Sequence, residues 1–270
     1  MTELTEDKVI LGFEQFSSIP NISHFVTTRS GGYSEDTFAS FNCAPFSGDD
    51  IEKVKRNQEV LCSKLGIQQQ RLVIPFQTHG NTIRAIDQLY LGLSPEEQQR
   101  RLHGVDALVT NLPGYCICVS TADCVPVLMY DTVNKAVAVV HAGWRGTVAR
   151  IVKQTLDVME NTYNTEAKDV VAAIGPSISL DSFEVGEEVY DAFQKTGFDM
   201  TKISIWKEDT QKHHIDLWEA NRLQLLDAGV LDDNIEISGI CTYEEHERFF
   251  SARRLGTKSG RILSGIMLSK

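Results

Sequence analysis

With 270 residues, 42% of them hydrophobic and 23% charged, the chain has an ordinary globular composition and is long enough to bury a core without disulfide bonds. Its formal net charge is −11, and Lys and Arg are scattered along it. Such an acidic protein repels phosphate backbones, which argues against nucleic-acid binding. The sequence contains no run of about 18 apolar residues, so no membrane span is expected.

The N-terminal segment and the cysteines predict a cytoplasmic protein. Residues 1–8 are polar and acidic, and they lack the basic start and apolar stretch of a signal peptide. The six cysteines are therefore expected to be mostly reduced thiols. This favours a metal-binding or catalytic cysteine over a disulfide framework.

The first third of the chain predicts short strands and two helices. A strand at 25–29 leads into a glycine turn at 30–34. Helical apolar spacing at 49–65 ends at Gly66, a typical C-terminal stop. A strand at 71–76 runs into Gln77-Thr78-His79-Gly80, and 95–102 predicts a brief exposed helix.

The centre of the chain predicts a β-hairpin followed by a long helix. Strands are expected at 106–110, 115–121, 125–130 and 136–140, and the polar segment 131–135 connects the last two. The glycine-containing segment 142–146 then ends the strand, and Thr147 is the expected N-cap of a helix over 148–163.

The last third continues the alternation of strands and helices. Strands are expected at 170–174, 235–240 and 262–268, and helices at 186–196 and 215–228. No linker or internal repeat interrupts the pattern. The sequence therefore predicts a single α/β domain over residues 1–270 that contains hairpins and not a purely parallel sheet.

The expected hairpin brings a cysteine and a histidine together. A turn centred near Thr132 and Val133 places Cys124 opposite His141, where facing Cβ atoms lie about 4.5–5.5 Å apart. A small register error would shift this pairing by only a residue or two. His79 lies just past the end of another strand, followed by the uncrowded backbone of Gly80.

His79, Cys124 and His141 form a sound ligand set for zinc. Three protein ligands leave a fourth position for water or substrate, which is typical of a catalytic zinc site. Asp123, beside Cys124, is a possible group for orienting a ligand imidazole. Taken singly, a strand-end histidine or a buried cysteine is more often structural. Spacing alone therefore leaves the metal site and the structural alternative about equally supported.

Two other cysteines, Cys116 and Cys118, lie two residues apart on an expected strand. They should share one face of it. This spacing does not match a zinc knuckle, so they are expected to be core residues.

Long motifs across nearly the whole chain resemble one family. Two of them surround the hairpin: Ala-Asp-Cys-Val-Pro-Val-Leu at 122–128 and His-Ala-Gly-Trp-Arg-Gly-Thr at 141–147. The sequence resembles the laccase-domain (YfiH-like) family, once described as multicopper polyphenol oxidases and now regarded as purine nucleoside phosphorylases. Further matching segments are 28–32, 41–42, 77–80, 106–110, 174–176, 183–186, 241–242 and 249–254.

The resemblance implies a layered α/β/β/α sandwich with mixed sheets and a zinc site at His79, Cys124 and His141. It also implies phosphorolysis of adenosine, guanosine, inosine and methylthioadenosine, together with deamination of adenosine. The expected partners are purine nucleosides and phosphate, and the expected assembly is a monomer or homodimer. Ser177, where the family often has Cys, and Ala252, where it often has Tyr, bear on substrate preference.

Phosphate would require a cationic site, which arginine suits because its guanidinium binds oxyanions in a bidentate manner. The expected substrate contacts are Arg29 on its glycine turn, Arg145 beside the metal ligands and, with less support, Arg253. Asn42 and Asp123 complete this set. The alternative role for the arginines is structural ion pairing.

Three other functions remain open. Cys124 and His141 would also suit the nucleophile and base of a thiol hydrolase or amidase. For such an enzyme, the family resemblance implies cell-wall precursors as substrates. A copper-dependent polyphenol oxidase is disfavoured, because the chain has seven histidines and none in a His-x-His arrangement, although copper would bind a Cys/His site. A non-catalytic, metal-bound scaffold predicts an exposed apolar patch.

Overall fold

The computed structural model describes residues 1–269, which form two six-stranded sheets and a small three-stranded sheet. The first large sheet has the order β1-β2-β3-β15-β7-β4, with bounds Thr2–Glu3, Ile10–Gly12, Ile22–Thr27, Ile262–Leu268, Cys116–Thr121 and Leu72–Val73. The second has the order β14-β10-β8-β9-β6-β5, with bounds Ile235–Ile237, Val170–Ile174, Val125–Asp131, Val137–Ala142, Ala107–Thr110 and Ile83–Ala85. Both are mixed, because the pairs β4–β7, β5–β6 and β10–β14 are parallel and the others antiparallel.

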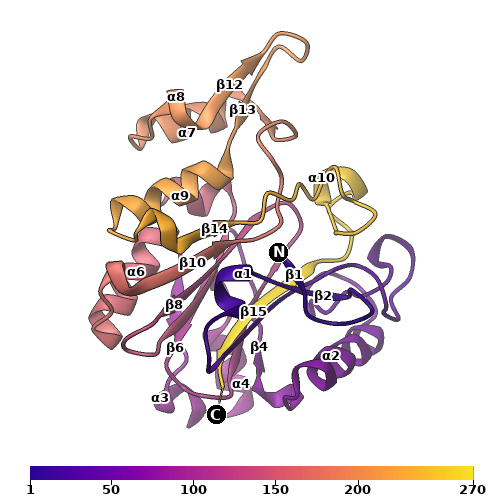
Figure 1. Cartoon of the computed structure of the whole chain (residues 1–270). Helices are drawn as coiled ribbons and strands as arrows, with labels where there is room; N and C mark the ends of the chain where they lie inside the picture. Colours follow the sequence, from indigo (N-terminus) through magenta and orange to yellow (C-terminus); the bar gives the residue numbers. More distant parts are fainter. Residues whose placement is uncertain (270) are drawn as a thin grey trace.

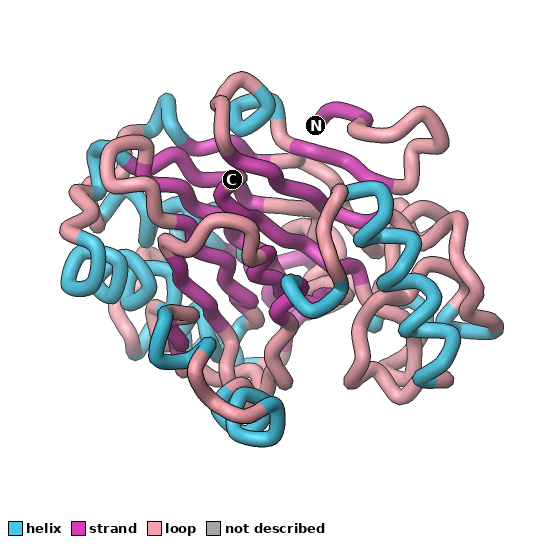
Figure 2. The backbone as a smooth tube through the Cα atoms, turned by 90° about the horizontal axis from the view of Figure 1, so that it is seen from below, coloured by secondary structure: helices cyan, strands magenta, loops and turns pink. Residues whose placement is uncertain are grey.

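The two large sheets pack face to face, and helices cover their outer faces (Figures 1 and 2). Alternate strand residues serve different layers, since successive side chains point to opposite faces. The core between the sheets includes Ile117, Val119, Leu128, Tyr130, Val137, Val139 and Ile266. This arrangement confirms the expected α/β/β/α layers.

Each outer layer is built around long helices. Leu61 of α2 (Ile51–Leu65) packs with Cys116 and Cys118 on the outer face of the first sheet, which confirms these cysteines as core residues. Helices α6 (Ile151–Tyr163) and α9 (Leu217–Asp227) cover the second sheet. The shorter α-helices are α1 (Glu14–Ser17), α3 (Gln88–Leu91), α4 (Pro95–Arg101), α5 (Trp144–Val148), α7 (Glu187–Lys195), α8 (Met200–Ile203) and α10 (Ala252–Leu255). Short 3₁₀ helices are η1 (Asp36–Phe38), η2 (Gln69–Arg71), η3 (Ala167–Asp169) and η4 (Asp232–Asn234).

The third sheet, with α7 and α8, forms the upper part of the molecule in Figure 1. Its strand order is β11-β13-β12, with bounds Glu184–Val185, Lys212–Ile215 and Ser204–Lys207. Within the part of the chain that the structure describes, no helix is both long and apolar enough to cross a membrane.

The expected end of the helix at 49–65 is confirmed, because Gly66 ends α2 in the left-handed conformation at φ 68°. The helix begins two residues later than expected, at Ile51, because Asp50 is its N-cap and accepts a hydrogen bond from the Glu52 N–H. The strand expected at 71–76 is shorter, however, and keeps only Leu72–Val73. The strand expected at 235–240 likewise ends at Ile237.

The hairpin forms, but its register differs from the expected one by two residues. Strands β8 and β9 pair Pro126 with His141, so Cys124 lies just before the ladder and not opposite His141. The turn is centred later because the Asp131 carboxylate accepts hydrogen bonds from the N–H groups of Val133 and Asn134 at 2.8 and 2.9 Å.

The expected helix over 148–163 is two helices. Arg150 has a left-handed backbone (φ 61°), which separates α5 from α6. Thr147 is therefore not an N-cap but lies inside α5, whose N-cap is Gly143. The Thr147 hydroxyl instead accepts a hydrogen bond from Asn221 Nδ2 of α9 at 3.2 Å.

Candidate metal centre

His79, Cys124 and His141 converge from three parts of the second sheet and its loops. His141 lies near the end of β9, Cys124 directly precedes β8, and His79 lies in the loop between β4 and β5. One ligand atom from each residue lies within 4.8 Å of the other two. The rings of His79 and His141 meet edge to face, with centroids 4.9 Å apart. These three side chains can therefore contact a single ion.

A buried carboxylate that sequence reasoning missed organises this group. Asp106 Oδ1 lies 2.7 Å from His141 Nδ1 and accepts the His79 N–H at 3.0 Å, and Oδ2 accepts the Gly80 N–H at 2.8 Å. Because an ionised carboxylate only accepts hydrogen bonds, His141 Nδ1 must carry the proton. Nε2 is then the nitrogen available to a metal. The role expected of Asp123 thus falls to Asp106, which directly precedes β6 of the same sheet.

A glycine provides the room that the three ligands require. A Cβ at Gly143 would lie 3.1 Å from Cys124 Sγ and 3.3 Å from His79 Cδ2. The Gly143 backbone, at φ −67°, is one that any residue adopts. Glycine is therefore required here for the close approach of the ligands and not for backbone freedom.

The charges in the group reinforce one another. Burial disfavours the Cys124 thiolate, but the imidazoles of His141 and His79 outweigh this effect and lower the pKa of Cys124 to about 6. Burial also disfavours a charged His141, but Cys124 and Asp106 raise its pKa to about 9. Cys124 is therefore ready to act as a thiolate ligand or nucleophile near neutral pH.

The three residues line a cavity of about 300 Å³. Its wall also contains Phe46, Phe76, Thr121 and Arg261. Arg261 was not singled out from the sequence, because the polar segment before the last strand contains no metal-ligand or nucleophile pattern. Its position beside the metal ligands comes from strand pairing, since β15 lies next to β7.

Two of the sequence-predicted substrate contacts hold loops together. Arg29 donates hydrogen bonds from Nε to the Ala39 carbonyl at 2.9 Å and from Nη1 to the His246 carbonyl at 2.7 Å. Asn42 is fully buried, and its Oδ1 accepts the backbone N–H of Arg261 at 3.1 Å. Neither residue lines the cavity.

The other three also lie outside the cavity wall. Asp123 accepts hydrogen bonds from the Thr242 hydroxyl at 2.8 Å and from the Arg253 N–H at 2.6 Å. The Arg145 guanidinium lies 4.2 Å from the ring of Trp144. Arg253 Nη2 donates to the Glu184 carbonyl at 3.2 Å. The structure thus brings together the expected metal ligands but not the expected substrate contacts.

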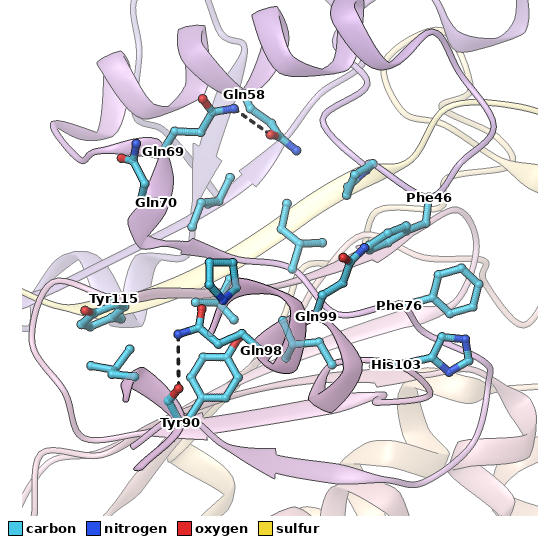
Figure 3. Close-up of a pocket in the computed structure, with 17 residues that line it drawn as sticks. Phe46, Gln58, Gln69, Gln70, Phe76, Tyr90, Gln98, Gln99, His103 and Tyr115 are labelled. Atoms are coloured by element: carbon cyan, nitrogen blue, oxygen red, sulfur yellow. Dashed lines mark hydrogen bonds between the residues drawn. The ribbon is translucent and has the colours of Figure 1, made fainter. Parts of the chain in front are cut away.

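A larger cavity of about 460 Å³ adjoins the first and shares Phe46 and Phe76 with it. The Phe76 ring stacks on His103 with centroids 4.7 Å apart, as Figure 3 shows. Among its lining residues are five glutamines and no Asp, Glu, Lys or Arg. The wall of this second cavity is therefore mainly aromatic, aliphatic and amide in character.

Comparisons with known proteins agree on one family. A family model described as multi-copper polyphenol oxidoreductase laccase matches residues 23–269. The chain is 62% identical to a purine nucleoside phosphorylase of Bacteroides thetaiotaomicron over 270 residues, which covers all of both proteins. It is 44% identical to adenosine deaminase RL5 of an unknown prokaryotic organism over 249 residues, covering 92% of this chain and 95% of that one. The crystal structure of the hypothetical protein YfiH of Bacillus licheniformis matches with a TM-score of 0.88 at 30% identity, covering 97% of each chain.

Proposed function

Because the chain belongs to the laccase-domain (YfiH-like) family, we propose that it is a zinc-dependent purine nucleoside phosphorylase that also deaminates adenosine. We assign this activity to one domain spanning the chain. The observation that carries the proposal is the convergence of His79, Cys124 and His141 on one cavity. The names of its relatives supply the reaction class.

The donor set fits zinc. Two imidazole nitrogens and one thiolate are ligands that zinc prefers, and three of them leave an open position. The space at Gly143 and the orientation of His141 by Asp106 support this assignment. A zinc ion bound there would supply Lewis-acid activation within the cavity.

In phosphorolysis, a phosphate oxygen forms a bond to the anomeric carbon of the ribose while the glycosidic C–N bond breaks. The electron pair of that bond passes to the purine, which takes up a proton as it leaves. Negative charge therefore develops on the base, and a cation or hydrogen-bond donor beside the purine would stabilise it. In deamination, the oxygen of water adds to C6 of adenine and the amino group leaves as ammonia.

Assays on protein of known metal content test this proposal. Adenosine, guanosine, inosine and methylthioadenosine are incubated with and without phosphate, and chromatography separates free bases, sugar phosphates and deaminated nucleoside. We expect Cys124→Ser and His141→Ala to lose zinc and both activities while remaining folded. Cys241→Ser, which changes a half-buried thiol outside the group, is the matched control. Full activity in either ligand variant would refute the assignment.

Copper is the rival metal, because the family description names it. A multicopper oxidase requires ligands for several ions, whereas residues 1–269 offer one group of three His, Cys, Asp or Glu ligands that could hold a metal. Copper would also bind such a site, since its intrinsic affinity exceeds that of zinc. An anaerobically prepared, zinc-loaded protein that oxidised phenols once exposed to oxygen would overturn this view.

A thiol hydrolase is the second candidate function, supported by the pKa shifts of Cys124 and His141. A thiolate beside a protonated imidazole is the arrangement of a cysteine nucleophile. Metal analysis combined with alkylation by iodoacetamide distinguishes the two functions. Stoichiometric zinc that protects Cys124 from alkylation supports the metalloenzyme, and a reactive Cys124 in active protein without zinc supports the hydrolase.

A further inference from the structure

Arg261 is an arginine of the cavity wall without a carboxylate partner. It takes part in none of the ion pairs found among residues 1–269. Its Nη1 donates to the carbonyls of Ser259 and Gly260 at 2.6 and 3.0 Å, and Nη2 donates to the Thr257 carbonyl at 2.9 Å. Nε has no acceptor within the described chain. One edge of the guanidinium is thus anchored by carbonyls, and donors remain for a ligand.

Arg261 carries its charge in a partly buried position. Burial lowers the pKa of its guanidinium, while the nearby Cys124 and Asp123 act in the opposite direction. The Asp123 carboxylate is already bound by the Thr242 hydroxyl and the Arg253 N–H. Because neither group forms an ion pair with Arg261 in the described residues, its guanidinium can still bind an anionic ligand.

A second polar group at the same place lacks a partner. The Thr121 hydroxyl is buried and makes no hydrogen bond within residues 1–269, and Thr121 is one of the residues that line the cavity. Thr121 at the end of β7 pairs with Ile262 of β15, the residue after Arg261. The two unsatisfied groups therefore lie at the same end of one ladder. Buried hydroxyl groups normally have hydrogen-bond partners, so this one has a free hydrogen-bonding capacity that a ligand could use.

The backbone of Arg261 is fixed in advance. The buried Asn42 accepts its N–H through Oδ1 at 3.1 Å, and Asn42 Nδ2 donates to Ser47 and Asp49, both at 2.8 Å. A side chain held on a rigid segment loses little freedom when it binds a ligand. Asn42 is therefore a positioning residue for Arg261.

We propose that Arg261 and Thr121 form an oxyanion site that binds the inorganic phosphate consumed by the reaction. This inference rests on the proposed function for the identity of the anion. Arginine matches a tetrahedral oxyanion by its fork of N–H groups, and a hydroxyl adds a further hydrogen bond. The other arginines considered from the sequence, Arg29, Arg145 and Arg253, do not line the cavity.

Calorimetric titration of zinc-loaded protein with inorganic phosphate tests the site without requiring turnover. We expect Arg261→Met to weaken phosphate binding by about 10- to 100-fold, the loss typical of a charge-assisted hydrogen bond. Arg261→Lys keeps the charge but not the fork of N–H groups, so its phosphate affinity should lie between those of the wild type and Arg261→Met. Arg145→Met is the matched control and should bind like the wild type. Wild-type affinity in Arg261→Met, or a loss confined to Arg145→Met, would overturn the proposal.

Thr121→Val covers the case in which the Arg261 variants do not fold. Valine replaces an unpartnered hydroxyl with a methyl group of similar shape, so the melting temperature should not fall. Phosphate binding should weaken about tenfold or more, as expected for the loss of one hydrogen bond to a charged oxyanion. Unchanged binding in this variant would remove Thr121 from the site and contradict the proposal as stated.

Kinetics and metal content separate the remaining outcomes. Arg261→Met should raise the KM for phosphate in inosine phosphorolysis far more than it changes adenosine deamination measured without phosphate. If the wild type has neither activity, the proposed function fails, but the calorimetric comparison still decides whether the anion site exists. If zinc content falls together with phosphate affinity, Arg261 acts through the metal ligands and the proposal is wrong.

Discussion

Replacing Asp106 with asparagine should weaken metal binding by about 10- to 100-fold, the range typical for partners of a ligand histidine. The carboxylate accepts three close hydrogen bonds, from His141 Nδ1 and from the N–H groups of His79 and Gly80. Asparagine has one acceptor oxygen, so it can serve either Gly80 or the pair His79 and His141. The amide NH₂ of the asparagine would then face whichever donors its oxygen does not serve, either Gly80 N–H or the N–H groups of His79 and His141.

The energetic size of this change follows from the same contacts. A buried donor that loses its acceptor costs about 1–3 kcal/mol. A 10- to 100-fold loss of affinity corresponds to about 1.4–2.7 kcal/mol. The two estimates agree because the donor that loses its acceptor, His141 Nδ1–H, belongs to the same imidazole ring as Nε2, the nitrogen available to the metal.

Competition with a chromophoric zinc chelator measures the affinity, and thermal unfolding measures the stability. Asp131→Asn is the matched control, since Asp131 is another fully buried carboxylate that accepts two backbone N–H groups, but in the hairpin turn. It should lower the melting temperature and leave zinc affinity unchanged. Asp106→Asn protein that bound zinc within threefold of the wild type would refute the reasoning.

Other changes test the packing and the titration of single groups. Gly143→Ala should lower zinc affinity about tenfold or more, because its methyl group would displace ligands whose metal distances tolerate only about 0.2 Å. The control is Gly92→Ala, where an added Cβ would make only ordinary contacts and zinc affinity should be unchanged. Equal effects of the two variants on chelator competition would contradict the steric argument. His24 is 5% exposed and accepts the Phe13 N–H through Nε2, and burial lowers its pKa to about 4. Since the folded pKa lies below the ordinary 6.5, the neutral form stabilises the fold above pH 6.5, and this contribution of about 3 kcal/mol is lost as the pH falls toward 4. Urea unfolding at several pH values should therefore show a steeper acid loss for the wild type than for His24→Gln, and parallel curves would exclude the contribution.

Local patterns were sufficient for features that depend on neighbouring residues. The terminal glycine of α2 depends on hydrogen bonds within one helix, so it could be predicted from 49–66. The alternation of Cys116 and Cys118 onto one face follows from strand geometry. The approach of Cys124 to His141 was predictable because a hairpin links residues that are close in sequence, although the turn residues shifted its register by two.

Features that depend on distant contacts could not be derived in this way. The carbonyls that bind Arg29 belong to residues 39 and 246, and the residue that fixes the Arg261 backbone is Asn42, 219 positions earlier. Nothing in the spacing of these residues distinguishes an arginine that closes a loop from one that faces the cavity. That distinction arises when β15 pairs with β7, because sheet pairing between remote strands places one side chain at the cavity wall while loop packing draws the others away.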